Sequence, residues 1–545
     1  MKILHNKYET IITSSILIIT SLIFIFSFLS LSSCRSADTE QDNTIRGGGI
    51  AAVNINLLGA EYANSDKPAQ IASINQKGAM VDNSVQHYNV LLTPSSFISA
   101  ELAPVTTLNT LASTSNMAAV SGNPIGTGVK FRVIAYRQSD GTYQTYQDYT
   151  IGQSATPMML DGGKAYDIVV YSYGVNTLPN ISANEQTSIR SATVNYDDTN
   201  RDFMYQKVSY TPDGNNPNNT LNITLRHKIA QITTVVNSFS LGNITNITGG
   251  VLTPHYSNGV ISLSTGIMSG RSNITSGAAL NFSGLNTTTA TAAPVFVNTD
   301  TGGNKTGGFS AAITIAGNTR TISLPNSFKI TPENKSDLTI NLIKCGAYVG
   351  PNTNPANYKE FMCHNLGADT SADPFAASAA IHGAKYQWGA QTDEAGRYVS
   401  QSVDQSNSGT IAGWNTGGKP NGSWSDTSKT GNDPCPAGYR VPTQAQWQAV
   451  IANNNVERVG AWANIGNYIT ALYFRNPSNV RTLMLPAAGY RFDADGTLSN
   501  RGFGGSYWSS SVATSDANFL SFNSSSVDVY DSRRALGFSV RCVAE

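Results

Sequence analysis

The chain has 545 residues, which exceeds the usual size of one domain and indicates three or four folding units. Its 35 basic and 35 acidic residues cancel, so the charge balance indicates neither nucleic acid nor an acidic membrane surface as a partner. Charged residues make up only 13% of the chain, and Asn, Ser, Thr and Gly take their place. This composition is typical of an exported protein rich in strands and loops.

The first 34 residues have the features of an export signal. Lys2 and Lys7 precede an apolar run from Ile11 to Leu31, and small residues then lead into Cys34. This segment resembles a bacterial lipoprotein signal, whose lipobox ends in the cysteine that receives the lipid. The resemblance implies lipidation at Cys34 and a lipid anchor in the outer membrane. The alternative is an uncleaved transmembrane anchor, because the apolar run is long enough to span a bilayer.

Four cysteines remain after Cys34, an even number in a chain expected to be exported. They are Cys345, Cys363, Cys435 and Cys542. Two disulfides are therefore expected, with three pairings open. A metal site is the competing hypothesis, but no two of these cysteines have C-x-x-C spacing, and His364 beside Cys363 is a single coincidence. We expect neither a metal site nor a cofactor.

A shift in composition near residue 343 divides the chain. All six tryptophans and these four cysteines lie at or beyond residue 345. The expected divisions are residues 1–34 for the signal, 35–46 for a propeptide or linker, 47–228 and 229–343 for two sandwiches, and 344–545 for a terminal domain.

Six stretches upstream of residue 343 show apolar alternation at period two or short apolar runs, which are typical of strands. They are 51–57, 129–133, 166–173, 221–225, 232–236 and 338–342. Turn-forming stretches such as 121–128 and 298–308 separate them, and helical periodicity is scarce. The pattern predicts tandem β-sandwiches.

Three stretches of this region carry a family resemblance. They are Tyr171-Ser172-Tyr173, Arg201-Asp202-Phe203-Met204-Tyr205 and Leu225-Arg226-His227-Lys228-Ile229-Ala230-Gln231-Ile232. They resemble the fimbrillin family of Bacteroidales surface pili. The resemblance implies two transthyretin-like β-sandwiches, a lipoprotein precursor, and other fimbrial subunits as partners.

The same resemblance implies a mechanism of assembly. In relatives, an Arg-specific protease removes the first strand, and a strand of the next subunit fills the opened groove by pairing with free backbone groups. Arg46, which precedes Gly47 and two further glycines, resembles that cleavage site. The alternative is that Arg46 is an ordinary linker residue.

His227 is a lone histidine between Arg226 and Lys228, with no carboxylate, serine or cysteine nearby in the sequence. Such a histidine on a strand is more often a packed structural residue than a catalytic one. We expect a structural role.

The terminal domain contains two clear local signals. Thr443 to Gln446 is a T-x-x-Q capping box followed by an apolar helical face, which predicts a helix of about ten residues from Thr443. Asp495-Gly496 predicts the turn of a hairpin over 491–498. A calcium loop is the alternative there, but an EF-hand needs acidic ligands where Arg491 and Gly502 stand. Further strands are expected at 506–511, 518–522 and 537–543.

Five separated motifs occur in order across this domain. They are Asn365-Leu366-Gly367, Cys435-Pro436, Arg440-Val441-Pro442-Thr443, Tyr507-Trp508-Ser509-Ser510 and Val540-Arg541-Cys542. They resemble the Fibrobacter succinogenes major paralogous domain, a family similar in fold to C-type lectin-like and formylglycine-generating-enzyme-like domains. The resemblance implies a mainly β chain that closes with an α+β C-type lectin-like domain. It also implies disulfides that join Cys435 to Cys542 and Cys345 to Cys363.

Loops rich in Gly, Ser, Asn and Thr carry Trp388, Trp414 and Trp424. Aromatic rings among hydrogen-bonding residues suit a sugar or protein ligand, so we take these three as ligand-binding candidates. The alternative is that they cover a small core. The sugar-binding triplets of calcium-dependent lectins are missing.

Formylglycine-generating enzymes use reactive cysteines, but cysteines that are paired in disulfides leave no thiol nucleophile. We therefore expect no enzyme.

The sequence predicts a fimbrial tip or accessory subunit at the cell surface that mediates adhesion to a host or bacterial glycan or protein, assembled by donor-strand exchange after proteolysis near Arg46. The tip position is expected because strand 537–543 is needed inside the terminal domain and is not free to be donated. The first alternative is a non-polymerising surface lipoprotein that binds glycan or protein through the C-terminal domain. The second is an enzyme of the formylglycine-generating type.

Overall fold

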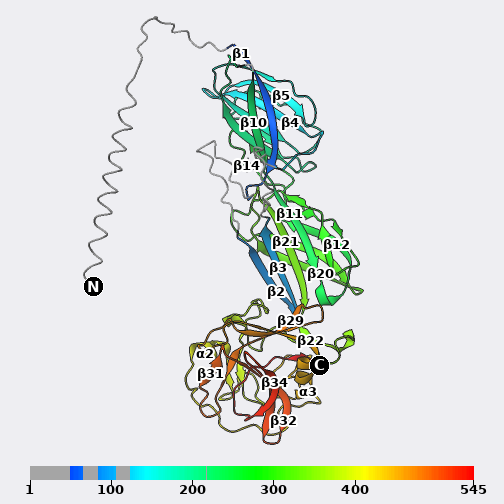
Figure 1. The fold of residues 1–545 in the computed structure, drawn as a ribbon, viewed down its shortest axis with the longest axis vertical. Helices are drawn as coiled ribbons and strands as arrows, with labels where there is room; N and C mark the ends of the chain where they lie inside the picture. The colour runs from blue at the N-terminus through cyan, green and yellow to red at the C-terminus, as the bar shows by residue number, and fades with distance from the viewer. Residues whose placement is uncertain (1–48, 65–83, 106–122, 217) are drawn as a thin grey trace, which may run out of the picture.

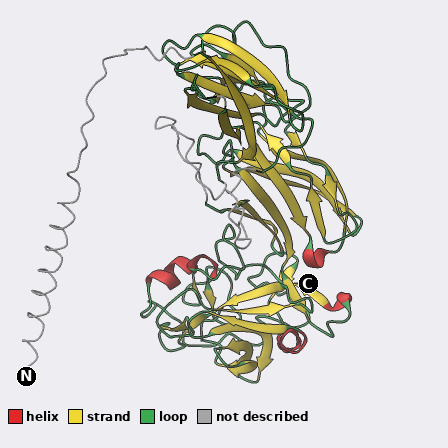
Figure 2. Cartoon of the chain, turned by 45° about the horizontal axis from the view of Figure 1, so that its top comes forward, coloured by secondary structure: helices red, strands yellow, loops and turns green. Residues whose placement is uncertain are grey.

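The computed structural model describes residues 49–64, 84–105, 123–216 and 218–545. The predicted lipidation and cleavage residues Cys34, Arg46 and Gly47 lie outside these residues. Three units follow one another, with β1 at one end and the third unit at the other (Figure 1). Figure 2 shows that strands dominate and that helices are few and short, which confirms the mainly β fold class. In the described part of the chain, no helix is long and apolar enough to cross a membrane.

The first unit contains one sheet in the order β5-β4-β7-β9-β10-β1-β6. Its strands are β1 (Ile50–Glu61), β4 (Lys130–Arg137), β5 (Tyr143–Thr150), β6 (Met158–Asp161), β7 (Tyr166–Ser172), β9 (Met204–Tyr210) and β10 (Asn219–His227). β4 is buried on both faces, because Val133 belongs to one apolar cluster and Ile134 to another. The cluster of Val133 also takes residues from β1, β6 and β10, so the sheet curls around it.

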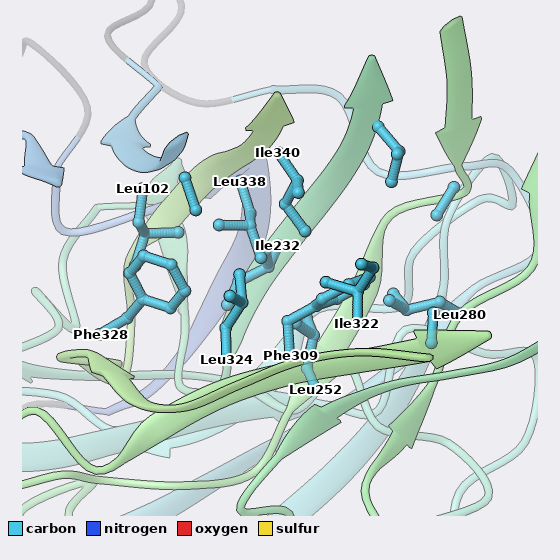
Figure 3. Packing of buried hydrophobic residues seen from close by; sticks show 14 of the residues in the cluster. Leu102, Ile232, Leu252, Leu280, Phe309, Ile322, Leu324, Phe328, Leu338 and Ile340 are labelled. Carbon is cyan, nitrogen blue, oxygen red and sulfur yellow. The ribbon is translucent and has the colours of Figure 1, made fainter. Parts of the chain in front are cut away.

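The second unit is a β-sandwich. Its sheets have the orders β16-β17-β11-β21-β3-β2 and β15-β12-β19-β20, and β18 also pairs with β11. The elements are β2 (Gln86–Thr93), β3 (Ser96–Pro104), β11 (Ala230–Asn237), η1 (Phe239–Leu241), β12 (Ile244–Thr253), β15 (Ala278–Ala279), β16 (Phe282–Ser283), β17 (Thr289–Ala292), β18 (Val295–Val297), β19 (Gly307–Ile315), β20 (Asn318–Phe328) and β21 (Lys335–Lys344). Figure 3 shows Ile232 and Ile340 of the first sheet pointing toward Phe309 and Leu324 of the second. Alternate residues of each sheet therefore form one shared core.

Each of the six stretches expected as strands overlaps a strand, namely β1, β4, β7, β10, β11 or β21. The expected boundary at residue 228 does not follow the sheets, however. β2 and β3 precede it in the chain, yet β3 pairs with β21 over its whole length, with Leu102 opposite Leu338. Period-two alternation identifies a strand but not its neighbour, so this exchange between the units was not visible in the sequence.

A second exchange joins the first two units, and here a segment that follows β12 in the chain packs on the first unit. β8 (Thr193–Asn195) pairs with β13 (Val260–Ser262), which pairs in turn with β14 (Met268–Ser269). Ile261 and Leu263 thereby enter a core cluster of the first unit. Each unit therefore lends a segment to the other.

The turn between β2 and β3 connects the second unit to the third. The carbonyl groups of Pro94 and Ser95 accept hydrogen bonds from the backbone N–H groups of Cys363 and Cys345, at 2.7 and 2.8 Å. The hydroxyl of Ser95, a residue only 1% exposed, donates to Glu360 and accepts from Tyr439. The third unit is thus held by a chain segment that lies about 250 residues earlier than the covalent junction at residue 344.

The third unit is an α+β assembly of small sheets and loops. Its elements are β22 (Gly346–Tyr348), η2 (Pro355–Asn357), β23 (Tyr358–Glu360), η3 (Ala379–Ile381), β24 (Lys385–Tyr386), β25 (Tyr398–Val399), α2 (Gln401–Ser406), β26 (Tyr439–Arg440), α3 (Gln444–Asn453), β27 (Asn455–Val459), β28 (Ala471–Arg475), β29 (Arg481–Pro486), β30 (Ala488–Arg491), β31 (Leu498–Arg501), β32 (Gly505–Ala513), β33 (Asp516–Phe522), β34 (Val527–Ser532) and β35 (Val543–Ala544). The largest sheet has the order β31-β30-β32-β33-β34. The likeness to C-type lectins stays a prediction.

Two local predictions in this unit are confirmed. α3 begins after Thr443, whose side chain accepts a hydrogen bond from the backbone of Gln446 while the Gln446 side chain caps Thr443 in return. β30 and β31 form the expected hairpin, with Arg491 opposite Leu498.

The expected strand over 537–543 is different in the structure. Only Val543–Ala544 is strand, and residues 537–539 form isolated bridges to three separate neighbours. The buried guanidinium of Arg541 donates to the carbonyls of Met362 and Cys363 and to the side chain of Asn365. The segment therefore bonds several elements at once and does not follow one partner strand.

The structure joins Cys435 to Cys542 and Cys345 to Cys363, the pairing that the resemblance implies. The first disulfide closes a loop with a sequence separation of 107, and the second a loop with a separation of 18. In the chain-entropy model, the longer loop restricts the unfolded chain more strongly.

Replacing both cysteines of each pair by alanine tests this difference. We expect Cys435→Ala/Cys542→Ala to lower the free energy of unfolding of the third unit by about 4 to 5 kcal/mol, and Cys345→Ala/Cys363→Ala by about 3 kcal/mol. Urea unfolding followed by tryptophan fluorescence measures the third unit alone, since all six tryptophans lie in it. Equal losses for the two variants would contradict the expectation.

Candidate functional site

The three tryptophans predicted as ligand-binding candidates are buried. Trp388, Trp424 and Trp414 are 0%, 1% and 8% exposed. Nε1 of Trp388 donates to the carbonyl of Ser509, and Nε1 of Trp424 donates to the carbonyl of Asn432, both at 3.0 Å. The structure corrects the expectation of a ligand surface on these rings and supports the alternative that they cover the core. Long polar loops supply few apolar side chains, so large rings fill the space beneath them.

Trp414 supports the hairpin that the sequence predicted. A Cβ added to Gly496, at the hairpin turn, or to Gly537 would lie 3.0 Å from atoms of the Trp414 ring. Gly496 also has φ +75°, a conformation that side chains with a Cβ rarely adopt. The backbone of the turn therefore packs directly against the indole of Trp414, which helps to hold the hairpin in position.

A groove of about 420 Å³ lies beside this hairpin, a volume typical of small-molecule sites. Phe538 is buried and Tyr490 and Phe519 are half-buried, so they form its inner surface. Phe492 and Phe503 are 41% and 38% exposed, and they line its outer edge. Aromatic side chains from β30, β33 and three turns thus converge on one hollow.

Polar groups complete the lining of the groove. They come from Asp493, Asn500, Ser506, Ser521, Asn523, Ser532 and Arg533. Arg533 donates to Asp493 at 2.7 Å, and its side chain is 78% exposed. The charged groups at the groove are therefore an ion pair with no net charge.

A buried ion cluster holds the hairpin in place. Asp404 of α2 is 0% exposed, and its carboxylate accepts hydrogen bonds from Arg491 and Arg501, both at 2.8 Å. Arg491 ends β30 and Arg501 ends β31, so the two ends of the hairpin are tied to one carboxylate. Lys385 Nζ lies 3.6 Å from the same group. Phe492 directly follows Arg491 in the chain, and Asn500 directly precedes Arg501. Since Phe492 and Asn500 line the groove, Asp404 positions the groove although it does not line it.

Burial and neighbouring charges shift the pKa values in this cluster. Burial alone would raise the pKa of Asp404, but the positive charges of Lys385, Arg491 and Arg501 outweigh it and hold the pKa below its usual value. Burial, with Lys385 and Arg501 nearby, lowers the pKa of His382 to about 3. His382 is therefore neutral in the folded protein at every physiological pH.

Two other hollows have similar volumes, about 490 Å³ in the first unit and about 540 Å³ beside the junction of the second and third units. In the first, the buried Glu185 accepts from Tyr171 and Ser182, and Asp197 accepts from Thr199 and Asn200. In the second, Glu360 accepts from Ser95 and forms an ion pair with Lys344. The groove of the third unit, which combines exposed phenylalanines with neutral polar groups, is the stronger candidate.

The two other residues that the sequence singled out, His227 and Asp495, have interaction partners within the protein. His227 stacks on Tyr62 at 4.0 Å, and its Nδ1 lies 2.5 Å from Asp202 Oδ1, a partner that was not evident because it is 25 residues away. Asp495 accepts from the backbone of Thr497 and so caps the hairpin turn. No group of three or more His, Cys, Asp or Glu side chains in the described ranges is placed to hold a metal ion.

Phe492 and Phe503 were not identified from the sequence, although a signal was present. Phe503 stands in Gly502-Phe503-Gly504-Gly505, where a large apolar residue has only glycines beside it. Glycines cover no neighbouring surface, so such a phenylalanine is left exposed.

None of the protein-family models and none of the curated proteins compared with the chain matches it. Some solved structures are similar to part of the chain. A candidate cell adhesion protein from Bacteroides uniformis is 14% identical, with 39% of this chain and 86% of that chain covered and a TM-score of 0.27. A fimbrial assembly protein from Parabacteroides distasonis is 11% identical over 39% and 87% of the two chains, with a TM-score of 0.26. A candidate cell adhesion protein from Bacteroides fragilis is 12% identical over 53% and 92%, with a TM-score of 0.28. TM-scores this low do not assign a function to the chain.

Asp404→Asn tests the role of the ion cluster. We expect a loss of about 3 to 5 kcal/mol in the free energy of unfolding of the third unit, because the substitution leaves buried cations without their counter-charge. Asp493→Asn is the control, since it breaks the ion pair with the exposed Arg533 and should change stability little. Urea unfolding measures both. Similar losses in the two variants would show that the cluster does not anchor the hairpin.

His382 gives a prediction for the pH dependence of stability. The unfolded chain protonates this histidine below about pH 6.5, whereas the folded protein keeps it neutral down to about pH 3. The unfolded state therefore binds more protons in that window, and stability falls as pH falls, by up to about 1.4 kcal/mol per pH unit. In urea unfolding between pH 6.5 and 4.5, His382→Leu should show a shallower slope than the unsubstituted chain. Parallel slopes would contradict the assignment.

Proposed function

We propose that the chain is a cell-surface adhesin, incorporated into a fimbrium as a tip or accessory subunit. The observation that carries the proposal is the groove of the third unit, which combines exposed phenylalanines with unshielded polar groups. The third unit lies at the end of the molecule opposite the start of β1 (Figure 1). A lipid on Cys34 anchors the precursor in the outer membrane, and the two β-rich units hold the groove away from it. The partner is a glycan or protein on a host or bacterial surface.

The edge of β1 supports assembly by strand addition. β1 pairs with β10 on one side, but β6 covers only Ile50 to Val53 on the other. From Asn54 to Gly59 that side of β1 pairs with no strand in the described part of the chain, and a strand of another subunit can pair there.

The position of Arg46 changes one step of the expected mechanism. β1 begins at Ile50, downstream of Arg46, so a cut after Arg46 leaves β1 in the sheet. The expectation that this cut removes the first strand does not hold for β1. In our proposal the cut releases the lipid-bearing segment, and the edge of β1 receives the incoming strand.

The segment 537–544 supports an accepting role. Cys542 is in a disulfide, Val543 and Ala544 pair with Tyr439 and Arg440, and Arg541 is buried. Donating this segment would require breaking these contacts. A subunit that accepts a strand but does not donate this one suits the tip of a fimbrium.

The four cysteines of the third unit favour binding over thiol chemistry. All four are in disulfides, so none of them is a free nucleophile of the formylglycine-generating type. We propose that this unit is a binding module.

Arg46→Ala in the native host tests processing and assembly. We expect the unsubstituted subunit, recovered from sheared fimbriae, to begin at Gly47, and the variant to stay in the membrane fraction at precursor size. Arg35→Ala is the matched control, because it removes the other arginine between Cys34 and Gly47. Normal amounts of the Arg46→Ala variant in fimbriae would contradict cleavage there. Absence of the unsubstituted chain from fimbriae would instead favour the non-polymerising lipoprotein.

A further inference from the structure

The groove of the third unit holds unused hydrogen-bonding capacity. The hydroxyls of Tyr490, Ser506, Ser521 and Ser532 and the side-chain nitrogens (Nδ2) of Asn500 and Asn523 make no hydrogen bond to the part of the protein that the structure describes. Elsewhere on β32 the situation is the reverse. Ser509 donates to the carbonyl of Asn518, and Ser510 and Ser511 donate to Asp426. Six groups of the groove lining are therefore free to bind a ligand, whereas these three serines of β32 are not.

The apolar surface of the groove is aromatic. Phe492 and Phe503 are the exposed phenylalanines of the third unit, and both line the groove. Behind them, Phe519 packs against Phe538 with ring centroids 4.6 Å apart. A ligand that enters meets flat apolar rings with hydroxyl and amide groups around them.

The charges at the groove argue against an ionic ligand. Asp493 and Arg533 neutralise each other at 2.7 Å, and the other polar lining groups are neutral hydroxyls and amides. A phosphate, sulfate or carboxylate would have to break this ion pair to obtain a counter-charge. The lining thus suits a ligand without net charge.

The structure also argues against a bridging metal ion. Asp493 is bonded to Arg533, and Asp495 accepts from the backbone N–H of Thr497. No cluster of three or more metal-ligating side chains was found among residues 345–545, all of which the structure describes. Calcium prefers six to eight oxygen ligands, which this lining does not assemble.

We infer that the groove binds a neutral saccharide directly, without calcium. A pyranose ring has a face of C–H groups and a rim of hydroxyls, so its face matches the phenylalanines and its rim matches the free hydroxyl and amide groups. Hydroxyls both donate and accept, as serine and tyrosine hydroxyls do, so the bonding is reciprocal. This inference rests on the proposed adhesive function and names the class of ligand for the same groove.

Phe503 and Phe492 give the sharpest test, because they are exposed and their removal leaves the core intact. The full processed chain is applied to an array of neutral, sialylated and sulfated oligosaccharides and of immobilised matrix proteins, in calcium and in EDTA. We expect binding to neutral oligosaccharides, unchanged by EDTA and at least about tenfold weaker in Phe503→Ala and in Phe492→Ala. Tyr146→Ala is the matched control, because Tyr146 is an aromatic residue of the first unit with the same 38% exposure as Phe503.

Four results would overturn the inference: binding only to charged glycans, binding only to proteins, loss of binding in EDTA, or neutral-glycan binding that the phenylalanine variants leave unchanged. Absence of any binding would overturn it as well. Adhesion of whole cells that display the chain to mucin, epithelial and bacterial surfaces is measured in parallel. Adhesion that persists without neutral-glycan binding would refute the ligand class but keep the adhesin. Loss of both would refute the proposed function too.

Discussion

The third unit depends on the bonds between the carboxylate of Asp404 and the guanidinium groups of Arg491 and Arg501. One acidic group on the short helix α2 thereby binds both ends of the β30–β31 hairpin, which is distant from it in sequence. One carboxylate cannot accept from every N–H group of two arginines, and backbone carbonyls supply further acceptors, including the carbonyl of Asp404 itself for both Arg491 and Arg501. Arg491 also donates to the carbonyls of Asn407 and Gly496, which draws the loop after α2 against the hairpin turn. The groove has a defined shape because the cluster has few alternative arrangements.

The same chemistry recurs at other buried arginines. Arg132 and Arg541, like Arg491, are among the largest fully buried side chains of a chain in which only 13% of residues are charged. Arg132 donates to the carbonyl of Pro179, and Arg541 to that of Met362. Irregular loops present carbonyls that no helix or strand satisfies, and an arginine offers five N–H donors in one planar group. Arg541 uses this property to join residues 362–365 to the segment that carries Cys542. A domain with little regular structure thus replaces ladder hydrogen bonds with buried guanidinium groups.

Local sequence signals predicted local structure well. Period-two alternation and short apolar runs located six strands, the Thr443 capping box located α3, and Asp495-Gly496 located the hairpin turn, because each of these depends on a few neighbouring residues. The sequence did not predict which strands pair with one another. The pairing of β3 with β21 depends on contacts across more than 230 residues, and no alternation pattern encodes them.

The groove could not be found for a similar reason. Tryptophans in polar loops gave the same signal whether they faced a ligand or the core, and burial decided for the core. The groove itself is built from Phe492, Phe503, Phe519 and Phe538, which come from four separate segments. Only the placement of Phe503 among glycines was a local indication.

The β2–β3 hairpin has a mechanical consequence for the proposed role in adhesion, in which the chain would bear tension. Force on the third unit reaches the second through the residues after Lys344, and therefore through β21. β3 pairs with residues 336–344 of β21 on one side, and β11 pairs with residues 335–341 on the other. Hydrogen bonds between strands lie across the strand direction, so a pull along β21 strains many of them together and does not open them one by one. Since Pro94 and Ser95 also bind the third unit directly, the load is shared between two chain segments at the junction where flow would act on an attached cell.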